Sequence, residues 1–372
     1  MNSIASRVTT LLGSSLLATS AAWGFPLIVV SPLTPQPVPT PPLFEASGKA
    51  VGVLAVDARA DKSFIADALI GPGADAGSGV FMGYGTPRGE DLAAFVETSA
   101  ADALPVLGFR PGKGSASDWN LTLTIVEFRV DMYRVSGFAP MNCMGYGVVQ
   151  AVLKDAGGND VRSRTLHLAY YENTVPKMSM KEVTTGALSR IYAQAAWEAV
   201  ASVLLEAAAP MPDAAAIEAL ARSIPDTKDD IAARRGIFWL GIVHQPLGAV
   251  TEALMASFRA PGEQKAFQAA AEALGKLGVA EAKPPIEAIL SGAEEIGDWD
   301  NADDEHVWYL LRALADLGET DLASKVPKTK LTMPSKLKDL IAFEASGTIP
   351  KISPAGAAKL DEAKKKLDKK RK

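Results

Sequence analysis

The sequence predicts an α+β domain over residues 46–208 followed by an all-α repeat domain over residues 213–346. Three observations support this fold class. The first region combines short strand-like apolar runs with two helical segments. The second region consists of Ala- and Leu-rich helical segments, and these segments repeat at a spacing of about 40 residues. A chain of 372 residues suits two domains, because domains usually contain about 100–200 residues.

Residues 1–24 predict a signal peptide that is cleaved after Gly24. Arg7 precedes an apolar run, and Ala22 and Gly24 are small residues at the two positions that a signal peptidase inspects. Ser and Thr residues interrupt the run. This favours cleavage over a retained anchor, because a spanning helix needs about 20 mostly apolar residues. The alternative of a retained anchor stays open. Either form places the folded part in the periplasm or outside the cell.

Residues 25–45 predict a proline-rich linker. The stretch SPLTPQPVPTPP over residues 31–42 contains six prolines, a composition typical of an extended polyproline-like spacer. We expect this spacer to hold the folded part away from whatever the N-terminus emerges from. No later apolar run approaches the length of a membrane span.

The α+β domain is predicted to begin with a buried strand over residues 51–56. Six glycines over residues 71–85 predict a long flexible loop, and residues 90–107 predict a helix with acids in its first turn. Residues 119–130 alternate apolar and polar positions as a strand does. The alternation changes parity near Ile125, which indicates a β-bulge.

Two further strands and a long helix complete the predicted domain. Residues 146–153 and 161–171 predict strands joined by the turn at 155–160, and residues 180–208 predict a helix. The expected architecture is an antiparallel or mixed sheet with two helices. Cys143 is the single cysteine of the chain, so an intramolecular disulfide is excluded, and we expect this side chain to be buried.

Part of this domain resembles a known family. The run VLAVDARADK over residues 53–62, the helix closing in Leu107-Gly108-Phe109 and the strand over residues 119–130 together resemble the YajG-type envelope lipoproteins, which are similar in turn to TolB N-terminal-like domains. The resemblance implies an envelope location and brings no catalytic residues. One departure matters: the family carries a lipid-modified cysteine after its signal, and this sequence has none there. Membrane attachment is therefore not implied.

The second domain contains three similar units. They are AARRGIFWLG ending at Gly241, AAAEALGKLG ending at Gly278 and VWYLLRALADLG ending at Gly318. Each glycine is expected to end a helix in the left-handed conformation that glycine adopts at low cost. The units resemble HEAT repeats, and three units are about the minimum for a stable stack. The resemblance implies a HEAT-like solenoid over residues 213–346 with a protein-binding surface.

The sequence predicts no catalytic, cofactor-binding or metal-binding residues. Residues 108–115 contain glycines and Lys113 but lack the spacing and the strand–helix order of a phosphate-binding loop. His167, His244 and His306 fall in separate elements without paired spacing. A thiol–imidazole pair of Cys143 and His167 lacks a third, orienting group, so we expect no cofactor.

Seven acidic residues crowd residues 294–305. As a calcium loop starting at Asp298 the segment would place Asp303 where glycine is required and Tyr309 at position twelve, so the EF-hand interpretation fails. We expect a solvated loop between repeats that also caps the next helix. An acidic docking patch is the alternative.

Residues 347–372 predict a basic tail. Residues 359–372 carry eight Lys or Arg against three acids, whereas the whole chain has a net charge of −5. The acidic body argues against a general nucleic-acid binder. We expect a solvated tail, with weak contact to an anionic surface as the alternative.

These features predict a non-catalytic scaffold or adaptor, periplasmic or secreted, whose partner is a protein of the cell envelope. A regulator of wall or outer-membrane assembly is a narrower alternative, based only on the likeness to TolB-like domains. An enzyme with a site at the junction of the two domains is the competing class.

Overall fold

The computed structural model describes residues 27–29, 32–60, 62, 66–70, 80–85, 91–113, 117–134, 141–174, 180–224, 227, 230–243, 248–259, 264–293, 304–326 and 334–349. The predicted signal peptide, the glycines of residues 71–79, residues 294–303 of the acidic segment and the tail from residue 350 lie outside the described residues. Among the helices that are described, none has both the length and the apolarity needed to cross a membrane.

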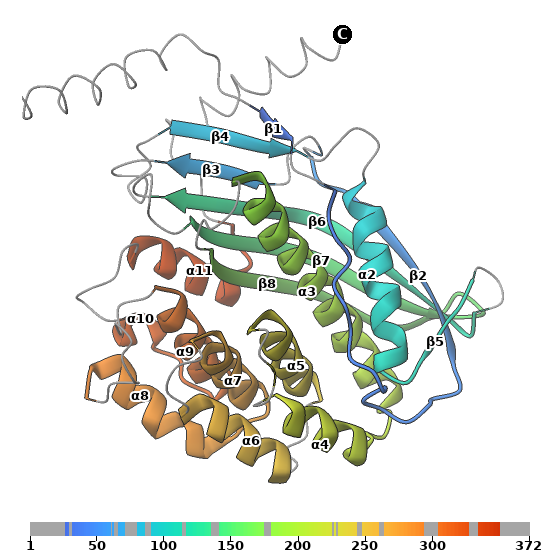
Figure 1. Cartoon of the computed structure of the whole chain (residues 1–372). Coiled ribbons are helices and arrows are strands. Elements are labelled where there is room, and N and C mark those ends of the chain that lie inside the picture. The colour runs from blue at the N-terminus through green and yellow to red at the C-terminus, as the bar shows by residue number, and fades with distance from the viewer. Residues whose placement is uncertain are drawn as a thin grey trace, which may run out of the picture.

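A mixed eight-stranded sheet forms the centre of the described fold (Figure 1). Its strands are β1 (Leu27–Val29), β2 (Ala50–Asp57), β3 (Ala66–Ile70), β4 (Val80–Gly85), β5 (Arg110–Pro111), β6 (Trp119–Arg134), β7 (Met141–Asp155) and β8 (Asp160–Thr174). The order is β1-β4-β3-β6-β2-β5, and β7 lies between β6 and β8. The structure thus confirms a mixed α/β fold with strands and helices in one body.

Strand β6 organises the sheet. Its first half pairs in parallel with β2, its second half pairs in parallel with β3, and its other edge pairs antiparallel with β7. The register with β7 shifts between Ile125 and Glu127, which confirms the predicted bulge. Because the bulge changes the parity of the strand, Ile125 and Phe128 both point into the core.

Two helices, α2 (Leu92–Val106) and α3 (Met180–Ala208), cover one face of the sheet (Figure 1). Asp91 caps α2 by accepting a hydrogen bond from the backbone N–H of Ala93 at 2.9 Å. Gly147 leaves room for the ring of Phe128, since a Cβ there would lie 2.8 Å from it. Phe128 therefore packs against Tyr192 of α3 with ring centroids 4.5 Å apart.

The C-terminal part is helical where it is described. It contains α4 (Ala214–Ser223), α5 (Asp230–Ile242), α6 (Gly248–Arg259), α7 (Gln264–Lys276), a 3₁₀ turn (Ala280–Ala282), α8 (Lys283–Ser291), α9 (Asp304–Asp316), α10 (Leu322–Lys325) and α11 (Pro334–Ser346). Gly278 and Gly318 follow α7 and α9 with φ of +67° and +85°, which confirms their predicted role as terminators.

The prediction that a glycine ends the helix is wrong for Gly241 of the first unit. It lies inside α5, where a Cβ would meet the Cα of Ala273 on α7 at 3.2 Å. Gly275 on α7 has the same role at the next helix contact. A Cβ there would lie 2.6 Å from the Cα of Ala313 on α9. The two glycines therefore let α5, α7 and α9 pack backbone to backbone rather than end a helix.

Helix α9 covers the free edge of β8, the last strand of the sheet (Figure 1). Arg312 donates to the backbone oxygen of Ala169 at 3.3 Å, and the Tyr309 hydroxyl donates to the backbone oxygen of Tyr171 at 3.1 Å. On the sheet, Tyr146 of β7 meets Phe343 of α11 edge-to-face with centroids 5.3 Å apart. One continuous hydrophobic core consequently joins the two parts.

The expected proline-rich spacer is wrong for the part that is described. Residues 32–45 run along the body, and Leu43 and Phe44 are fully buried. The backbone N–H of Leu43 donates to Val106 at 2.9 Å, and its carbonyl accepts from Asp213 at 2.9 Å. The apolar side chains between the prolines give the segment a packing face that the proline content concealed.

Candidate functional site

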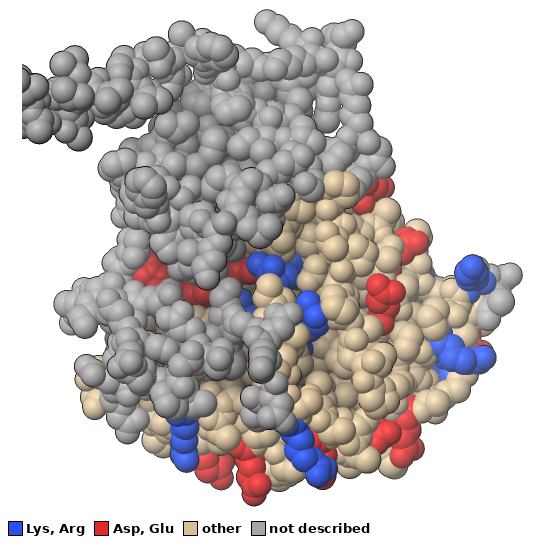
Figure 2. Space-filling view, in the orientation of Figure 1, with Lys and Arg blue, Asp and Glu red and all other residues tan. Residues whose placement is uncertain are grey.

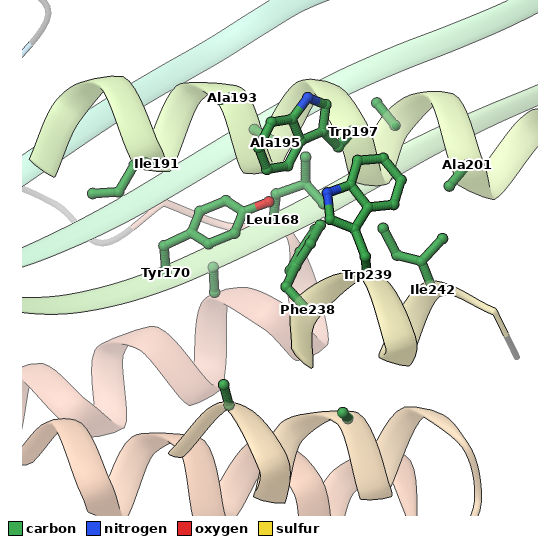
Figure 3. Packing of buried hydrophobic residues seen from close by; sticks show 14 of the residues in the cluster. Leu168, Tyr170, Ile191, Ala193, Ala195, Trp197, Ala201, Phe238, Trp239 and Ile242 are labelled. Atoms are coloured by element: carbon green, nitrogen blue, oxygen red, sulfur yellow. The ribbon is translucent and has the colours of Figure 1, made fainter. Parts of the chain in front are cut away.

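Helix α3 lies between the sheet and the C-terminal helices, and its buried face is aromatic. Trp197 packs against Phe238 and Trp239 of α5 at centroid distances of 5.8 and 5.3 Å, as Figure 3 shows. The indole N–H of Trp197 donates to the backbone oxygen of Ser99 on α2 at 3.1 Å. These contacts hold α3 in place and so position the charged side chains on either side of the aromatic group.

A cluster of charged residues lies buried between α3, α7, α9 and β8. We call it the sealed cluster; it consists of Tyr170, Glu198, Glu272, Lys276 and Arg312. Lys276 pairs with Glu272 at 3.0 Å and with Glu198, and Arg312 lies 2.9 Å from Glu272 and 3.5 Å from Glu198. The Tyr170 hydroxyl donates to Glu198 at 2.8 Å. Two cations thus balance two carboxylates.

The electrostatics of the sealed cluster follow from this balance. Burial raises the pKa of Glu198, but Lys276 and Arg312 outweigh burial and bring that pKa down to about 2. Glu344 of α11 pairs with Arg312 at 3.1 Å at the margin of the cluster. Burial raises the pKa of Glu344 to about 7, since Asp316 and the two cluster carboxylates oppose the effect of Arg312.

A solvent-open hollow lies on the other side of the aromatic group, between α3, α5 and the proline-rich segment. It is small: about 20 Å³ is open to a water molecule, which is enough for about one water. We call it the arginine hollow; its lining residues are Gln36, Glu172, Arg190, Gln194, Trp197, Ile231, Arg234 and Arg235. Figure 2 shows basic atoms gathered over α3 and α5 with acidic atoms beside them, next to a broad uncharged surface.

Arg190 and Arg234 of the hollow each form an ion pair. Arg190 donates through Nε to Glu172 at 2.6 Å and also through Nη2. Arg234 donates through Nη2 to Glu305 at 3.2 Å and to the hydroxyl of Tyr309. Burial lowers the pKa of Arg234, but Tyr309, Glu305 and Glu172 outweigh it and raise that pKa. Both guanidinium groups are therefore held in place by their carboxylate partners.

The proline-rich segment forms one wall of the hollow. Arg235 donates to the side-chain oxygen of Gln36 at 3.3 Å, and the Gln36 amide nitrogen donates to the carbonyl of Thr34 at 2.8 Å. The backbone N–H of Thr34 in turn donates to the Ser189 hydroxyl on α3 at 3.0 Å. A planar amide of the chain itself therefore occupies the edge of the hollow.

The structure does not bring Cys143 and His167 together. Cys143 is buried and lies opposite Glu172, whereas His167 lies opposite Val148, five residues further along β7. That separation is roughly 17 Å along the strand. The ring of His167 instead lies beside that of Phe343, with ring centroids 6.1 Å apart. His306 is buried in α9, and His244 lies outside the described residues.

The other candidate segments also have structural roles where they are described. Within residues 108–113, Arg110 and Pro111 form β5 and pair with β2, so this segment is strand rather than phosphate loop. Asp304 and Glu305 are buried at the start of α9, which corrects the expectation of a solvated loop for these two residues. The ion pair with Arg234 compensates the cost of burying the carboxylate of Glu305.

Sequence reasoning missed every charged residue of the sealed cluster and of the hollow. A usable signal was present: Arg312 interrupts the apolar run VWYLLRALA, and Arg234 and Arg235 interrupt IAARRGIFWL. A charge on the buried face of a helix needs a partner, because an isolated buried charge is costly. Within the described residues, no group of three His, Cys, Asp or Glu side chains could hold a metal ion.

No family model matches the chain. No curated protein matches it either. Among solved structures, the chain is similar to a Xanthomonas campestris protein of family DUF330, with 18% identity, a TM-score of 0.31, and coverage of 46% of this chain and 92% of that one. It is also similar to an uncharacterised protein, with 12% identity, a TM-score of 0.27, and coverage of 43% and 95%. At these scores, neither likeness carries an argument about fold or function.

Proposed function

We propose that the protein is a non-catalytic scaffold or adaptor of the bacterial cell envelope that binds a protein partner. The arginine hollow is the observation that carries this proposal. Three of its lining side chains are arginines, which stay protonated at all physiological pH values. Such groups bind acidic surfaces rather than transfer protons, so the site suits recognition.

The helical part fits a HEAT-like role in the same proposal. Helices α5, α7 and α9 approach one another through Gly241 and Gly275, as stacked repeat units do. Their inner side already packs on α3 and β8. A partner would therefore use the outer helices α4, α6 and α8 and the rim of the hollow. The YajG-like interpretation of residues 46–208 and the envelope location also belong to this proposal, and they rest on the sequence alone.

Capture from envelope extracts tests the proposal. The full chain carrying Arg235→Glu reverses one of the three positive charges of the hollow, whereas Arg162→Glu reverses an exposed charge on β8, outside the helices proposed to bind, as a matched control. We expect the wild type and the control to retain the same partner and Arg235→Glu to lose it. Equal capture by all three proteins would mean that the partner does not bind at the hollow.

The predicted cleavage after Gly24 has its own test: the N-terminal sequence of the exported protein should begin at Phe25.

The basic tail gives a separate, smaller prediction. The full chain should bind vesicles of anionic lipid at about 20 mM salt and lose that binding when residues 359–372 are deleted, because each Lys or Arg near such a surface contributes about 1 kcal/mol. Co-sedimentation with vesicles measures it, with neutral vesicles as the control.

A further inference from the structure

We propose that residues 357–372 form a helix that docks on the part of the sheet that α11 leaves uncovered, through a stripe of Leu360, Ala363 and Leu367. Three observations support this contact. They are an apolar part of the sheet that is open to solvent, the place where the described chain ends, and the spacing of apolar residues in the segment that follows. The contact lies within one chain and is independent of the adaptor role.

The sheet face opposite α2 and α3 is covered only in part. Tyr146, Val148 and Gln150 alternate along β7 and therefore point to one face, whereas Gly147 between them faces Phe128 on the side of α3. Helix α11 packs on Tyr146, but Gln150 is exposed. Directly paired residues share a face. The exposed part, which we call the open sheet face, consists of Leu54, Val56, Thr122, Thr124, Gln150 and Val152.

The open sheet face is apolar for a surface in contact with solvent. Leu54 is 53% exposed and Val56 is 40% exposed, although both lie in the middle of the sheet region that β2 forms with β6. Val126, at the bulge of β6, is also an exposed large hydrophobic side chain. A sheet normally buries an apolar face against a second layer. We therefore expect a further element to cover this surface.

The described chain ends on the same face of the sheet. Gly347, directly after α11, lies against the ring of His167 on β8, and a Cβ at this glycine would collide with that ring. His167 pairs with Val148 and so points to the face that carries the open sheet face. Ile349 is partly buried against the core. The segment from residue 350 onwards therefore starts beside the surface that lacks a cover.

Residues 350–358 are long enough to reach the open sheet face. Leu54 lies three strands away from His167 and five residues further along the sheet. With about 4.8 Å between strands and about 3.4 Å per residue, the straight distance is roughly 22 Å. Nine extended residues span up to about 30 Å. Because the two parts belong to one chain, docking is intramolecular, and a small apolar stripe is then sufficient.

The sequence of the segment fits a helix that lies on a sheet. Pro354 and Gly356 precede a run from 357 to 372 that contains neither residue type. Leu360, Ala363 and Leu367 are three and four positions apart, which places them on one side of a helix. On the opposite side lie the cations Lys365, Lys369 and Lys372. The lysines thus stay solvated while the leucines pack.

The reactivity of an introduced thiol in the full chain tests the proposal. The native Cys143 is buried, so Leu54→Cys places the reactive thiol on the open sheet face. Met211→Cys is the control, because Met211 is 65% exposed at a different place, before α4. If the docked state dominates, deletion of residues 350–372 should raise the rate of maleimide labelling of Leu54→Cys roughly fivefold or more. The rate for Met211→Cys should not change.

Two matched double variants of the full-length chain separate the stripe from the charge of the segment. Leu360→Lys with Leu367→Lys removes the stripe and should raise the labelling rate of Leu54→Cys as much as the deletion does. Lys365→Gln with Lys369→Gln lies on the opposite side of the helix and should leave that rate unchanged.

Three results would overturn the proposal. The first is equal labelling of Leu54→Cys with and without residues 350–372. The second is an equal effect of the leucine and lysine double variants. The third is protection that grows with protein concentration and appears together with a dimer in sedimentation, since a second copy would then cover the surface. None of these results bears on capture of a partner from envelope extracts, so the adaptor role is tested separately.

Discussion

The sealed cluster and the arginine hollow both combine arginine with glutamate, yet they differ in how their arginines are held. In the sealed cluster, Arg312 meets the carboxylates of Glu198, Glu272 and Glu344 and a backbone carbonyl, and it is almost inaccessible. In the hollow, among the described residues, Arg190 pairs with Glu172 alone, and Arg234 bonds to Glu305 and to the hydroxyl of Tyr309. The difference teaches that the number of carboxylates around an arginine, rather than the presence of arginine, separates a fully sealed ion-pair network from one at the surface.

Among these variants, we expect Arg312→Met to lower the free energy of unfolding most. The substitution leaves Glu198 and Glu272 with Lys276 as their remaining cation. Breaking a buried ion pair from one side typically costs about 3–5 kcal/mol, and we expect a loss of that size in the free energy of unfolding. Urea denaturation measures it. Arg222→Met is the control: its side chain is 73% exposed, and we expect a change below about 0.5 kcal/mol. A comparable loss in both variants would contradict the structural role of the cluster.

The next largest expected effect is a pH dependence of the free energy of unfolding that comes from Glu344. Its pKa is raised to about 7, so between roughly pH 4.5 and 7 the folded state binds a proton that the unfolded state has released. The free energy of unfolding should therefore fall as pH rises through this window, by at most about 3 kcal/mol. The 26% exposure of the side chain reduces that figure.

The matched variant separates Glu344 from other titrating groups. Glu344→Gln should flatten the decline between pH 5 and 8, as measured by urea denaturation at each pH, and Glu218→Gln on the surface of α4 should not. Glu198 acts with the opposite sign, because its pKa of about 2 means that its contribution to stability is lost only as pH falls below about 4. An unchanged profile in Glu344→Gln would exclude the raised pKa.

Gly275→Ala disturbs the backbone under the sealed cluster without changing a charge. The new Cβ would lie 2.6 Å from the Cα of Ala313 and force α7 away from α9. We expect a loss of about 1–3 kcal/mol from overpacking. Gly248→Ala is the control, because nothing lies within 4 Å of its Cβ position. Thermal unfolding of both variants measures the difference, and equal midpoints would mean that the helices can separate freely.

Arg235→Met should have the smallest effect on stability, below about 1 kcal/mol, because this side chain is half-buried at the surface whereas that of Arg312 is buried. A near-wild-type melting temperature would sharpen the contrast with Arg312. A loss as large as that of Arg312→Met would place the hollow among the structural sites.

Local patterns predicted much of the fold. The helix over residues 180–208 has the predicted bounds, and the hairpin of β7 and β8 and the bulge after Ile125 follow from alternation and turn residues that act over short distances. Strand β4 was missed, because it lies among the glycines that predicted a loop. The parallel pairing of β2 with β6 could not be inferred either, since it joins segments far apart in the chain.

The candidate site was beyond sequence reasoning for a similar reason. A charge inside an apolar run, such as Arg312, shows that a partner is needed but does not say which one. Glu198 and Glu272 lie on two other helices, and only the three-dimensional packing selects them. The role of Gln36 was even harder to predict from the sequence, because it depends on a proline-rich segment that folds back onto α3.

Because α9 covers the edge of β8, the sheet can be completed only after the C-terminal helices have been synthesised. Tyr309 and Arg312 follow the strand residues that they cap by 138 and 143 positions. While the chain is being made, β8 can pair with β7, but its other edge stays open until α9 has formed. An open strand edge is a template for pairing with a second chain. A chain that ends before residue 309 is therefore expected to self-associate, and the last helices protect the newly made protein from its own sheet.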